Sequence, residues 1–176
     1  ELFSIAYQDE TPINIAARDI SVLNQMQKEK TSFSVSVENN KNIYHLRVFH
    51  KDKRISLSEI MPIFDDLGLH VTHENPHNIK VSENNFWIHD FGITLDNSQK
   101  LPKESIQTLS NALKLAWKTD LESDELNGLI LSGGLDTRQI IILRAIIAYI
   151  QQIGSKYDQS YIRQILVKNA HMANHL

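Results

Sequence analysis

A short charged loop carries the residues best suited to bind a small anion. Residues 50–54 read His-Lys-Asp-Lys-Arg, and Ser56 follows two positions later. The loop joins a predicted strand to a predicted helix, so its cations stand beside the free amides of a helix N-terminus, where the dipole favours negative charge. We therefore take Lys51, Lys53, Arg54 and Ser56 as a candidate effector-binding set for a small acid. The alternative is a charged turn that is simply solvated.

A glycine-containing loop nearer the C-terminus resembles a nucleotide-binding motif. Residues 129–137 read Leu-Ile-Leu-Ser-Gly-Gly-Leu-Asp-Thr, similar to the Ser-Gly-Gly-X-Asp-Ser/Thr loop of ATP pyrophosphatases, whose backbone amides approach phosphates. That fold needs further parallel strands after the loop, whereas the 39 residues after Thr137 are predicted to be helical. The alternative for Ser132–Thr137 is a turn between two helices, in which glycines permit positive φ and Asp136 caps the second helix. The sequence favours this turn.

Histidines are numerous but are not spaced as metal ligands or catalytic groups. His70, His73 and His77 follow one another closely, yet positions 70 and 73 of one strand face opposite sides. We predict that these three histidines lie on the surface of a half-exposed sheet. The pair His89-Asp90 resembles the dipeptide of metal-dependent phosphohydrolases, but it lies in a predicted strand. We expect a structural role for it, with the aspartate accepting hydrogen bonds from nearby backbone amides.

Composition excludes several classes of function. The 176 residues include no cysteine, which excludes disulfides, thiolate nucleophiles and cysteine-based metal sites. The net charge is −3 and no stretch is strongly basic, so the charge pattern does not indicate nucleic-acid binding. The longest apolar run, Ile140–Ile150, is too short to span a membrane. There is no Walker loop, catalytic triad or Gly-X-Gly-X-X-Gly fingerprint, so no nicotinamide site is apparent. We expect a soluble, cytoplasmic segment of a longer protein, because the chain starts at Glu1 without a signal peptide.

Hydrophobic periodicity predicts a helix and a β-hairpin at the start of the chain. We expect an amphipathic helix within a connector that occupies residues 1–31. Its predicted buried stripe is Ile13, Ala16, Ala17, Ile20, Leu23 and Met26. Strict alternation over Ser32–Val37 and Ile43–His50 predicts two half-buried strands, joined by a turn at Asn39–Asn42. The second strand is expected to bury Tyr44, Leu46 and Val48.

Two more helices flank the remaining strands. Ser56–Glu59 form a capping box before a helical stripe that contains Pro62 and ends at Gly68. Strands are predicted over His70–Glu74, weakly over Ile79–Val81, and over Phe86–Leu95, with turns at Asn75-Pro76 and Glu83–Asn85. Pro102 can open a helix that extends to Trp117. Residues 32–119 therefore predict the order β-β-α-β-β-α, or one strand fewer if residues 79–81 are a loop. This is an α+β domain with helices on one face of an antiparallel sheet.

The remaining residues, 120–176, are predicted to form an all-α helical module. Asp136–Gln139 is a capping pattern that leads into a helix over Ile140–Ile150, which Gly154 ends. That helix is apolar nearly all round, so we expect it to be covered on several sides. Asp158 can cap a last helix that carries Ile162, Ile165 and Leu166.

Four stretches taken together resemble the large bacterial NAD-specific glutamate dehydrogenases. They are Ile55–Val71, Trp87–Gly92, the segment from Ala116 through Asp124 and Asn127 to Ala145, and Gln159–Ile162. Tyr7, Pro12, Ala16 and Asp19-Ile20 extend the similarity towards the start. The spacing of these stretches is intact along nearly the whole chain. Residues 133–139 depart from the family's usual sequence, so the pyrophosphatase-like string looks like a coincidence in a family turn.

The resemblance implies a regulatory region that lies N-terminal to a dehydrogenase core. It implies an ACT-like (ferredoxin-like) module of order βαββαβ over residues 32–119, followed by helical linkers. The parent enzyme would use NAD to deaminate L-glutamate to 2-oxoglutarate, with no catalytic or NAD-binding residue in this segment. We expect self-association through sheet edges or helices, contact with the parent's catalytic core, and an amino-acid effector, with no nucleic-acid, metal or membrane partner. The alternatives are a purely structural spacer or an ATP-pyrophosphatase-like fragment.

Overall fold

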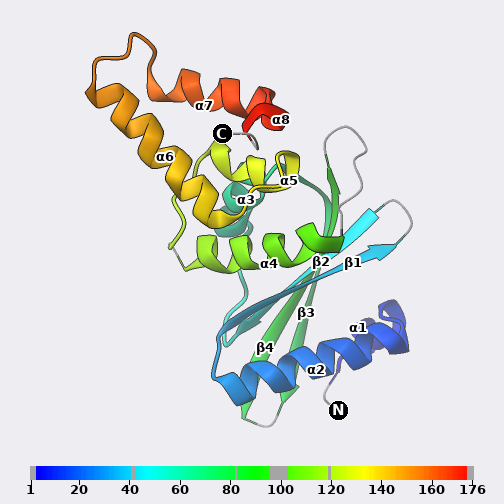
Figure 1. Ribbon diagram of the computed structural model, residues 1–176. Coiled ribbons are helices and arrows are strands. Elements are labelled where there is room, and N and C mark those ends of the chain that lie inside the picture. The colour runs from blue at the N-terminus through cyan, green and yellow to red at the C-terminus, as the bar shows by residue number, and fades with distance from the viewer. Residues whose placement is uncertain (1–2, 41–42, 82, 96–102, 119, 174–176) are drawn as a thin grey trace. The chain divides into compact units, whose positions relative to one another are not determined.

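A computed structural model describes residues 3–40, 43–81, 83–95, 103–118 and 120–173 (Figure 1). The chain forms two compact units, one of residues 1–57 and 71–94 and one of residues 58–70 and 95–176. These units do not coincide with the segments 1–31, 32–119 and 120–176 expected from the sequence, whose boundaries stay a prediction. No described helix is both long and apolar enough to cross a lipid bilayer.

The first unit is built on a four-stranded sheet, and the predicted α+β class is confirmed. Its strands are β1 (Phe33–Asn40), β2 (Ile43–Lys51), β3 (Leu69–Val81) and β4 (Asn84–Leu95), in the spatial order β1-β2-β4-β3. β2 lies in the centre and pairs antiparallel with both β1 and β4. Both faces of β2 are covered, because Leu46 and Val48 on one face and Arg47 and Phe49 on the other are all buried.

The order of elements along the chain follows the prediction made from the residues. From β1, it runs through β2, α3 (Leu57–Asp66), β3 and β4 to α4 (Lys103–Trp117), which is strand-strand-helix-strand-strand-helix. This order differs from the βαββαβ order that the family resemblance implied. The implied order ends on a strand, whereas here an additional strand, β1, comes before β2, and no strand follows α4 among the described residues. That strand, β1, still pairs beside β2.

β3 is longer than predicted. A turn was expected at Asn75-Pro76, but the strand continues without a break from Leu69 to Val81 and includes the weakly predicted residues 79–81. β3 stands at the end of the strand order. An edge strand tolerates a proline, because one side of its backbone has no ladder hydrogen bond to lose. The predicted turn was therefore wrong.

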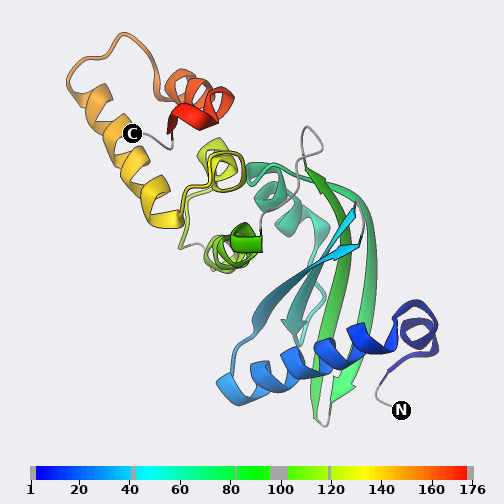
Figure 2. The same ribbon diagram turned by 45° about the vertical axis from the view of Figure 1, so that its right-hand side comes forward.

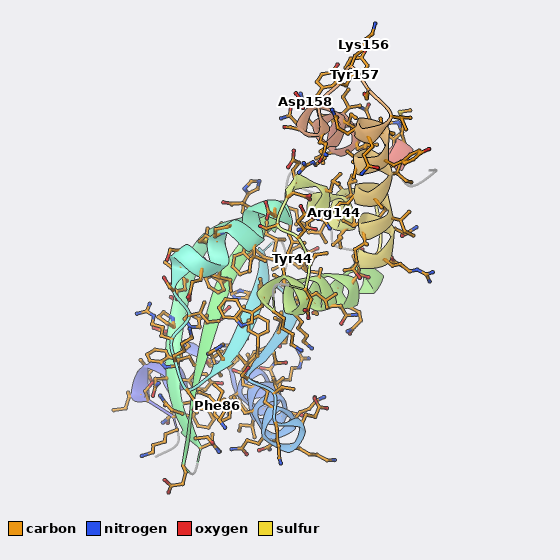
Figure 3. The ribbon with its side chains drawn as sticks, turned by 90° about the vertical axis from the view of Figure 1, so that its left-hand side faces the viewer. Tyr44, Phe86, Arg144, Lys156, Tyr157 and Asp158 are labelled. Carbon is orange, nitrogen blue, oxygen red and sulfur yellow. The ribbon has the colours of Figure 1, made fainter. Side chains whose placement is uncertain are left out.

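Two helices cover one face of this sheet. α1 (Ile5–Glu10) and α2 (Ile13–Glu29) lie across the strands in both views (Figures 1 and 2). Their shared core consists of Tyr7, Leu23, Met26, Phe49, Ile79, Phe86 and Ile88. Phe86 lies on this part of the sheet (Figure 3). On the opposite face of β2, Tyr44, Leu46 and Val48 are buried as predicted.

The buried face of α2 is rotated from the predicted stripe. Leu23 and Met26 are buried, but Ile13 is 89% exposed and Ile20 is 42% exposed, whereas Asp19 is only 1% exposed. The helix therefore turns a carboxylate towards the sheet and leaves two isoleucines in solvent. The reason is a buried arginine on β2, which requires a counter-ion in the apolar interior.

The second unit is helical. After α3 and α4 it contains a 3-10 helix, η2 (Glu125–Gly128), and then α5 (Leu129–Ser132), α6 (Thr137–Gln152), α7 (Gln159–Lys168) and α8 (Ala170–Ala173). Pro62 lies inside α3, as predicted. Gly68 and Gly154 adopt positive φ after α3 and α6, also as predicted. Pro102 lies outside the described residues.

The environment of α6 differs from the prediction. Ile140, Leu143 and Ile147 are buried, so one face of α6 packs within the unit. The opposite face was expected to be covered too, but it is open: Ile141 is 52% exposed, Ile142 47%, Ile146 46% and Tyr149 61%. This expectation was wrong, because the apolar composition of a helix does not determine how many neighbours it finds.

Candidate functional site

A cavity of about 650 Å³ lies in the first unit, between the start of α2 and the strands β1, β2 and β4. Its volume falls in the range of small-molecule sites. Figure 2 shows how α2 runs along the sheet, and Asn14, Ile15 and Arg18 of this helix line the cavity. Six of the lining residues are ionisable: Glu10, Arg18, Glu38, His45, Arg47 and Asp90. The cavity is therefore lined by charges of both signs rather than by an apolar surface.

Arg47 is the buried cation of this site. It alternates with Leu46 and Val48 on β2, so it points to the face that α2 covers, and it is only 2% exposed. One terminal nitrogen, Nη1, lies 3.1 Å from Oδ2 of Asp19, and the other, Nη2, lies 3.5 Å from Oδ2 of Asp90. Its Nε is buried and has no hydrogen-bond partner among the described residues. The guanidinium group is thus neutralised but incompletely hydrogen-bonded.

Asp19 supplies the carboxylate that faces Arg47 from α2. The hydroxyl of Tyr7 donates a hydrogen bond of 2.5 Å to Oδ2 of Asp19. Burial raises the pKa of Asp19 to about 6, although Arg47 and the Tyr7 hydroxyl both act to lower it. Burial, and then the hydrogen bond to Asp19, also raises the pKa of Tyr7 well above its ordinary value. Desolvation therefore has the largest effect on the pKa values of both Asp19 and Tyr7.

The rim of the cavity holds two further contacts between ionisable side chains. Arg18 lies 2.9 Å from Glu38, and Nδ1 of His45 lies 3.0 Å from Oδ1 of Asp90. Asp90 thus contacts side chains, His45 and Arg47, and the expectation that it would accept backbone hydrogen bonds was wrong. The reason is its strand register, which places Asp90 directly opposite Arg47.

His77 corrects another expectation. We predicted it on the surface, but it is only 6% exposed and its ring meets that of Tyr7 edge-on at 5.2 Å between centroids. Its Nε2 lies 3.7 Å from Oε2 of Glu10. Burial lowers the pKa of His77. His77 is covered because α1 packs over this part of β3, which the sequence pattern of β3 alone does not reveal.

The loop predicted to bind a small acid lies on the same unit, and its Arg54 contacts two side chains of the sheet. Nη2 of Arg54 lies 3.6 Å from Oε1 of Glu74, and its guanidinium lies 5.9 Å from the ring centroid of Trp87. Lys51 is half-buried, whereas Lys53 and Ser56 are exposed. The assignment of Lys51, Lys53, Arg54 and Ser56 to an effector site stays a prediction.

His89 anchors this loop from the sheet. It is fully buried; its Nδ1 lies 2.7 Å from Oε1 of Glu74, and its Nε2 accepts a hydrogen bond of 3.2 Å from the amide of Ile55. Burial lowers the pKa of His89, against the opposing effect of Glu74. These contacts are the structural role that we expected. Among the described residues, no group of three or more histidines and carboxylates is placed to hold a metal ion.

The loop Ser132–Thr137 joins two helices, α5 and α6, as the helix-turn alternative predicted. Gly134 has a φ of 67°, in the left-handed region. The side chain of Asp136 accepts a hydrogen bond from the amide of Gln139, whose side chain accepts from the amide of Asp136 in return. A pyrophosphatase loop follows a strand, whereas residues 129–132 here are helical. The loop therefore lacks the strand-to-helix setting of a pyrophosphatase loop and has the helix-to-helix setting that the alternative predicted.

Comparison with known proteins identifies the family. The model described as glutamate dehydrogenase, ACT3 domain, matches residues 29–106, and the one described as glutamate dehydrogenase, helical motif 3, matches residues 121–176. Similar relatives include the NAD-specific glutamate dehydrogenases of Halomonas elongata (27% identical over 94% of this chain), Pseudomonas aeruginosa (29% over 96%) and Mycobacterium tuberculosis (28% over 97%). The chain spans about a tenth of their length, 10% or 11%. It belongs to this glutamate dehydrogenase family, of which it carries the ACT3 domain and helical motif 3.

The sequence analysis missed the residues at the centre of the cavity. Arg47 has the spacing of a solvent-facing residue on a half-buried strand, and Asp19 lies beside the predicted apolar stripe of its helix. The positions of Arg47 and Asp19, considered together, could have predicted that the two side chains meet. A cation in the middle of a central strand and a carboxylate next to a helix's apolar face would neutralise each other if that helix covered that strand.

Proposed function

We propose that this chain is a non-catalytic regulatory segment of an NAD-dependent glutamate dehydrogenase. The complete enzyme would convert L-glutamate and NAD to 2-oxoglutarate, ammonia and NADH in the cytoplasm. The proposal draws on the names of the relatives and on the match to their ACT3 domain and helical motif 3. The proposal assigns no NAD-binding residue to this segment, in which the glycine turn at 132–137 joins two helices.

The observation that carries a regulatory role is the cavity around Arg47. A domain that only spaced other domains would gain stability from an apolar interior in its place, because a buried ion pair is costly to desolvate. Here a half-satisfied arginine lies against a cavity large enough for a metabolite. Such a site is expected of a module that binds a small molecule.

The test measures the response of the complete dehydrogenase that contains this segment. Initial rates of NADH formation from L-glutamate are recorded with and without each common amino acid, in the wild type and in an Arg47→Lys variant. We expect at least one amino acid to change the wild-type rate and the variant to lose that response. Arg138→Gln, an exposed change on α6, is the matched control and should respond like the wild type. An enzyme whose rate no amino acid changes would contradict the proposal.

A second candidate is a structural role in self-association, and the open face of α6 favours it. Ile141, Ile142, Ile146 and Tyr149 are exposed along one side of this helix, and Ile153 beyond its end is 66% exposed. On α7, which has no buried residue, Tyr161 is 48% exposed and Ile165 is 42% exposed. The helices and the loop Lys156–Asp158 between them are seen in Figure 3. Exposed apolar residues gathered along one side of a helix favour a protein interface there.

Sedimentation equilibrium separates this candidate from the first. We expect the wild-type chain to associate with a second copy, and an Ile142→Lys plus Ile146→Lys variant to remain a monomer at the same concentrations. The matched control, Lys156→Ala in the exposed loop, should associate like the wild type. If the wild type is a monomer up to about 100 μM, the open face does not join copies with the affinity of a stable dimer.

A further inference from the structure

We propose that His45 and His73 together bind a divalent transition-metal ion such as zinc, through the Nε2 atoms of their imidazole rings. The proposal is independent of the regulatory function, because it rests on the two rings and the groups that hold them. From the sequence we expected no metal partner. The two histidines belong to different strands, β2 and β3, so no spacing along the chain reveals the pair.

The sheet brings the two histidines to either side of one glycine. β4 lies between β2 and β3, and Gly92 of β4 is directly opposite His45 of β2. The ring of His73 occupies the space beside Gly92, where an added Cβ atom would stand 2.0 Å from its Cε1 and 2.4 Å from its Nδ1. The rings of His45 and His73 are 6.0 Å apart between centroids and are inclined at 69°. A residue with a side chain at position 92 would displace the His73 ring from this position.

Hydrogen bonding fixes the tautomer of His73. The hydroxyl of Thr72 donates its hydrogen to the carbonyl oxygen of Gly92, at 3.0 Å. The same hydroxyl oxygen, Oγ1 of Thr72, lies 3.0 Å from Nδ1 of His73, and towards the ring it can only accept, since its one hydrogen is already used. The hydrogen of the neutral ring is therefore on Nδ1, and the lone pair that could bind a metal is on Nε2.

A carboxylate holds His45 in the same tautomer. Nδ1 of His45 lies 3.0 Å from Oδ1 of Asp90, and an ionised carboxylate can only accept, so the hydrogen of this ring is also on Nδ1. Histidines at metal sites commonly donate from one nitrogen to a carboxylate, which orients the ring and makes the other nitrogen a better ligand. An ion can reach both rings, because the side chain of His45 is 30% exposed and His73 is exposed.

The ligand type and the ring spacing define the class of metal. Imidazole nitrogens suit zinc, nickel and copper, whereas magnesium and calcium prefer oxygen ligands. Two such nitrogens at about 2.0–2.1 Å from one ion place the ring centroids roughly 5 to 6 Å apart, so the observed 6.0 Å needs little adjustment. Water would fill the remaining positions, since no third histidine or carboxylate ligand joins such a group among the described residues.

The direct test is a titration of the 176-residue chain with zinc chloride. Isothermal titration calorimetry gives the stoichiometry and the dissociation constant, and nuclear magnetic resonance spectra of the ¹⁵N-labelled imidazole rings identify the ligating nitrogens. We expect one ion per chain, saturable shifts of Nε2 of His45 and of His73, and no binding of magnesium chloride. Because the metal competes with protons for both rings, the dissociation constant for zinc should rise when the pH is lowered from about 7.5 to about 6.

Three variants locate the ion. His45→Gln and His73→Gln each remove one ligand, and each should raise the dissociation constant for zinc about tenfold or more, since even the loss of a group that only orients a ligand has an effect of that size. Gly92→Ala retains both histidines but places a methyl group where the His73 ring lies, so it should raise the constant by a similar factor. Because that ring is exposed and can turn aside, the fold is retained, which dispersed amide spectra verify. His171→Gln, an exposed change on α8, is the matched control and should bind zinc like the wild type.

Four results would contradict the proposal. One is that zinc at about 1 mM, a concentration that detects even weak binding, leaves the ring signals of His45 and His73 unchanged. Another is equal binding of zinc by the wild type, His45→Gln and His73→Gln, because other, adventitious ligands would then hold the ion. Equal binding by Gly92→Ala and the wild type would show that the pairing of the two rings does not hold the ion. Loss of binding in His171→Gln alone would place the site on the helical unit instead.

Discussion

The two units each contain an arginine that contacts a buried carboxylate, but in the described part of the chain only one of the two has an acceptor for its Nε. Arg144 on α6 donates from Nε to Asp124 at 2.9 Å and from Nη2 to Asp124 at 2.7 Å. Nη2 also reaches the Asn127 side chain at 2.8 Å and the Glu122 carbonyl at 3.0 Å. Figure 3 shows Arg144 on its helix. Arg47 has two carboxylates at 3.1 and 3.5 Å and an Nε with none.

The difference separates an arginine held within one local cluster from an arginine that joins distant elements. The residues around Arg144 are close in sequence and hold each other, since Asp124 also caps η2 through the amide of Leu126. Bidentate geometry fixes the guanidinium of Arg144 against Asp124. The partners of Arg47 come from separate elements, α2 and β4, and its buried Nε has no acceptor among the described residues.

The largest expected effect tests the structural half of this comparison. Replacing Arg144 by leucine leaves Asp124 buried without its main partner, which typically costs about 3 to 5 kcal/mol of unfolding free energy. Arg163 lies 3.4 Å from the same carboxylate, so we expect the lower end of that range. Urea denaturation followed by circular dichroism at pH 7 measures the loss. Arg138→Gln, exposed on the same helix, should change stability by less than about 0.5 kcal/mol. A loss below about 1 kcal/mol for Arg144→Leu would remove the distinction between the two arginines.

The pH dependence of stability tests the other half. The folded-state pKa of Asp19, about 6, lies above the ordinary value of 3.8 for an aspartate, so the folded state holds the proton more tightly than the unfolded state. The contribution of Asp19 to stability is therefore fully present below pH 3.8 and is lost as the pH rises through about 6. The loss is on the order of 3 kcal/mol. Urea denaturation at a series of pH values should show this decline in the wild type and its absence in Asp19→Asn. Parallel profiles for the two proteins would mean that Asp19 is not desolvated as described.

A smaller effect is expected from the hydroxyl of Tyr7. Tyr7→Phe removes the hydrogen bond to Asp19 and leaves that carboxylate less well satisfied, at a cost of about 1 to 2 kcal/mol. Because this hydrogen bond lowers the pKa of Asp19, the variant should also move the decline in stability to higher pH. Tyr149→Phe makes the same chemical change on an exposed residue and serves as the control. Equal changes in the unfolding free energy at the two tyrosines would show that the hydroxyl of Tyr7 does not stabilise the contact between Asp19 and Arg47.

The smallest effect concerns the start of the helix that carries Arg144. Asp136→Ala removes the capping box of α6 and should lower the unfolding free energy by about 1 kcal/mol, whereas Asp136→Asn retains the cap and should have little effect. Thermal denaturation of the two variants side by side gives the difference. An alanine variant as stable as the asparagine variant would indicate that packing, and not the cap, fixes the start of this helix.

The sequence by itself determined the α+β class, the element order from β1 to α4, and the N-terminal caps of α6 and α7. These features follow from local rules, since alternation specifies strands, and Asp136 and Asp158 cap their helices with contacts that span three residues. The family could also be recognised from the sequence, because the resemblance depends on the order and spacing of residues. The turn at Ser132–Thr137 was predicted for the same local reason.

Only the tertiary structure decided which side chains meet. Hydrophobic periodicity defines the faces of α2 but does not show which face is buried. Because Arg47 needs a counter-ion, the buried face of α2 includes Asp19, and Ile20 is left exposed. The cavity is assembled from α1, α2, β1, β2 and β4, so no single stretch of sequence displays it. In the same way, the apolar residues of α6 specify a helix but not its neighbours. Contacts between distant segments depend on how faces are paired in space, and that information lies in the fold and not in any local pattern.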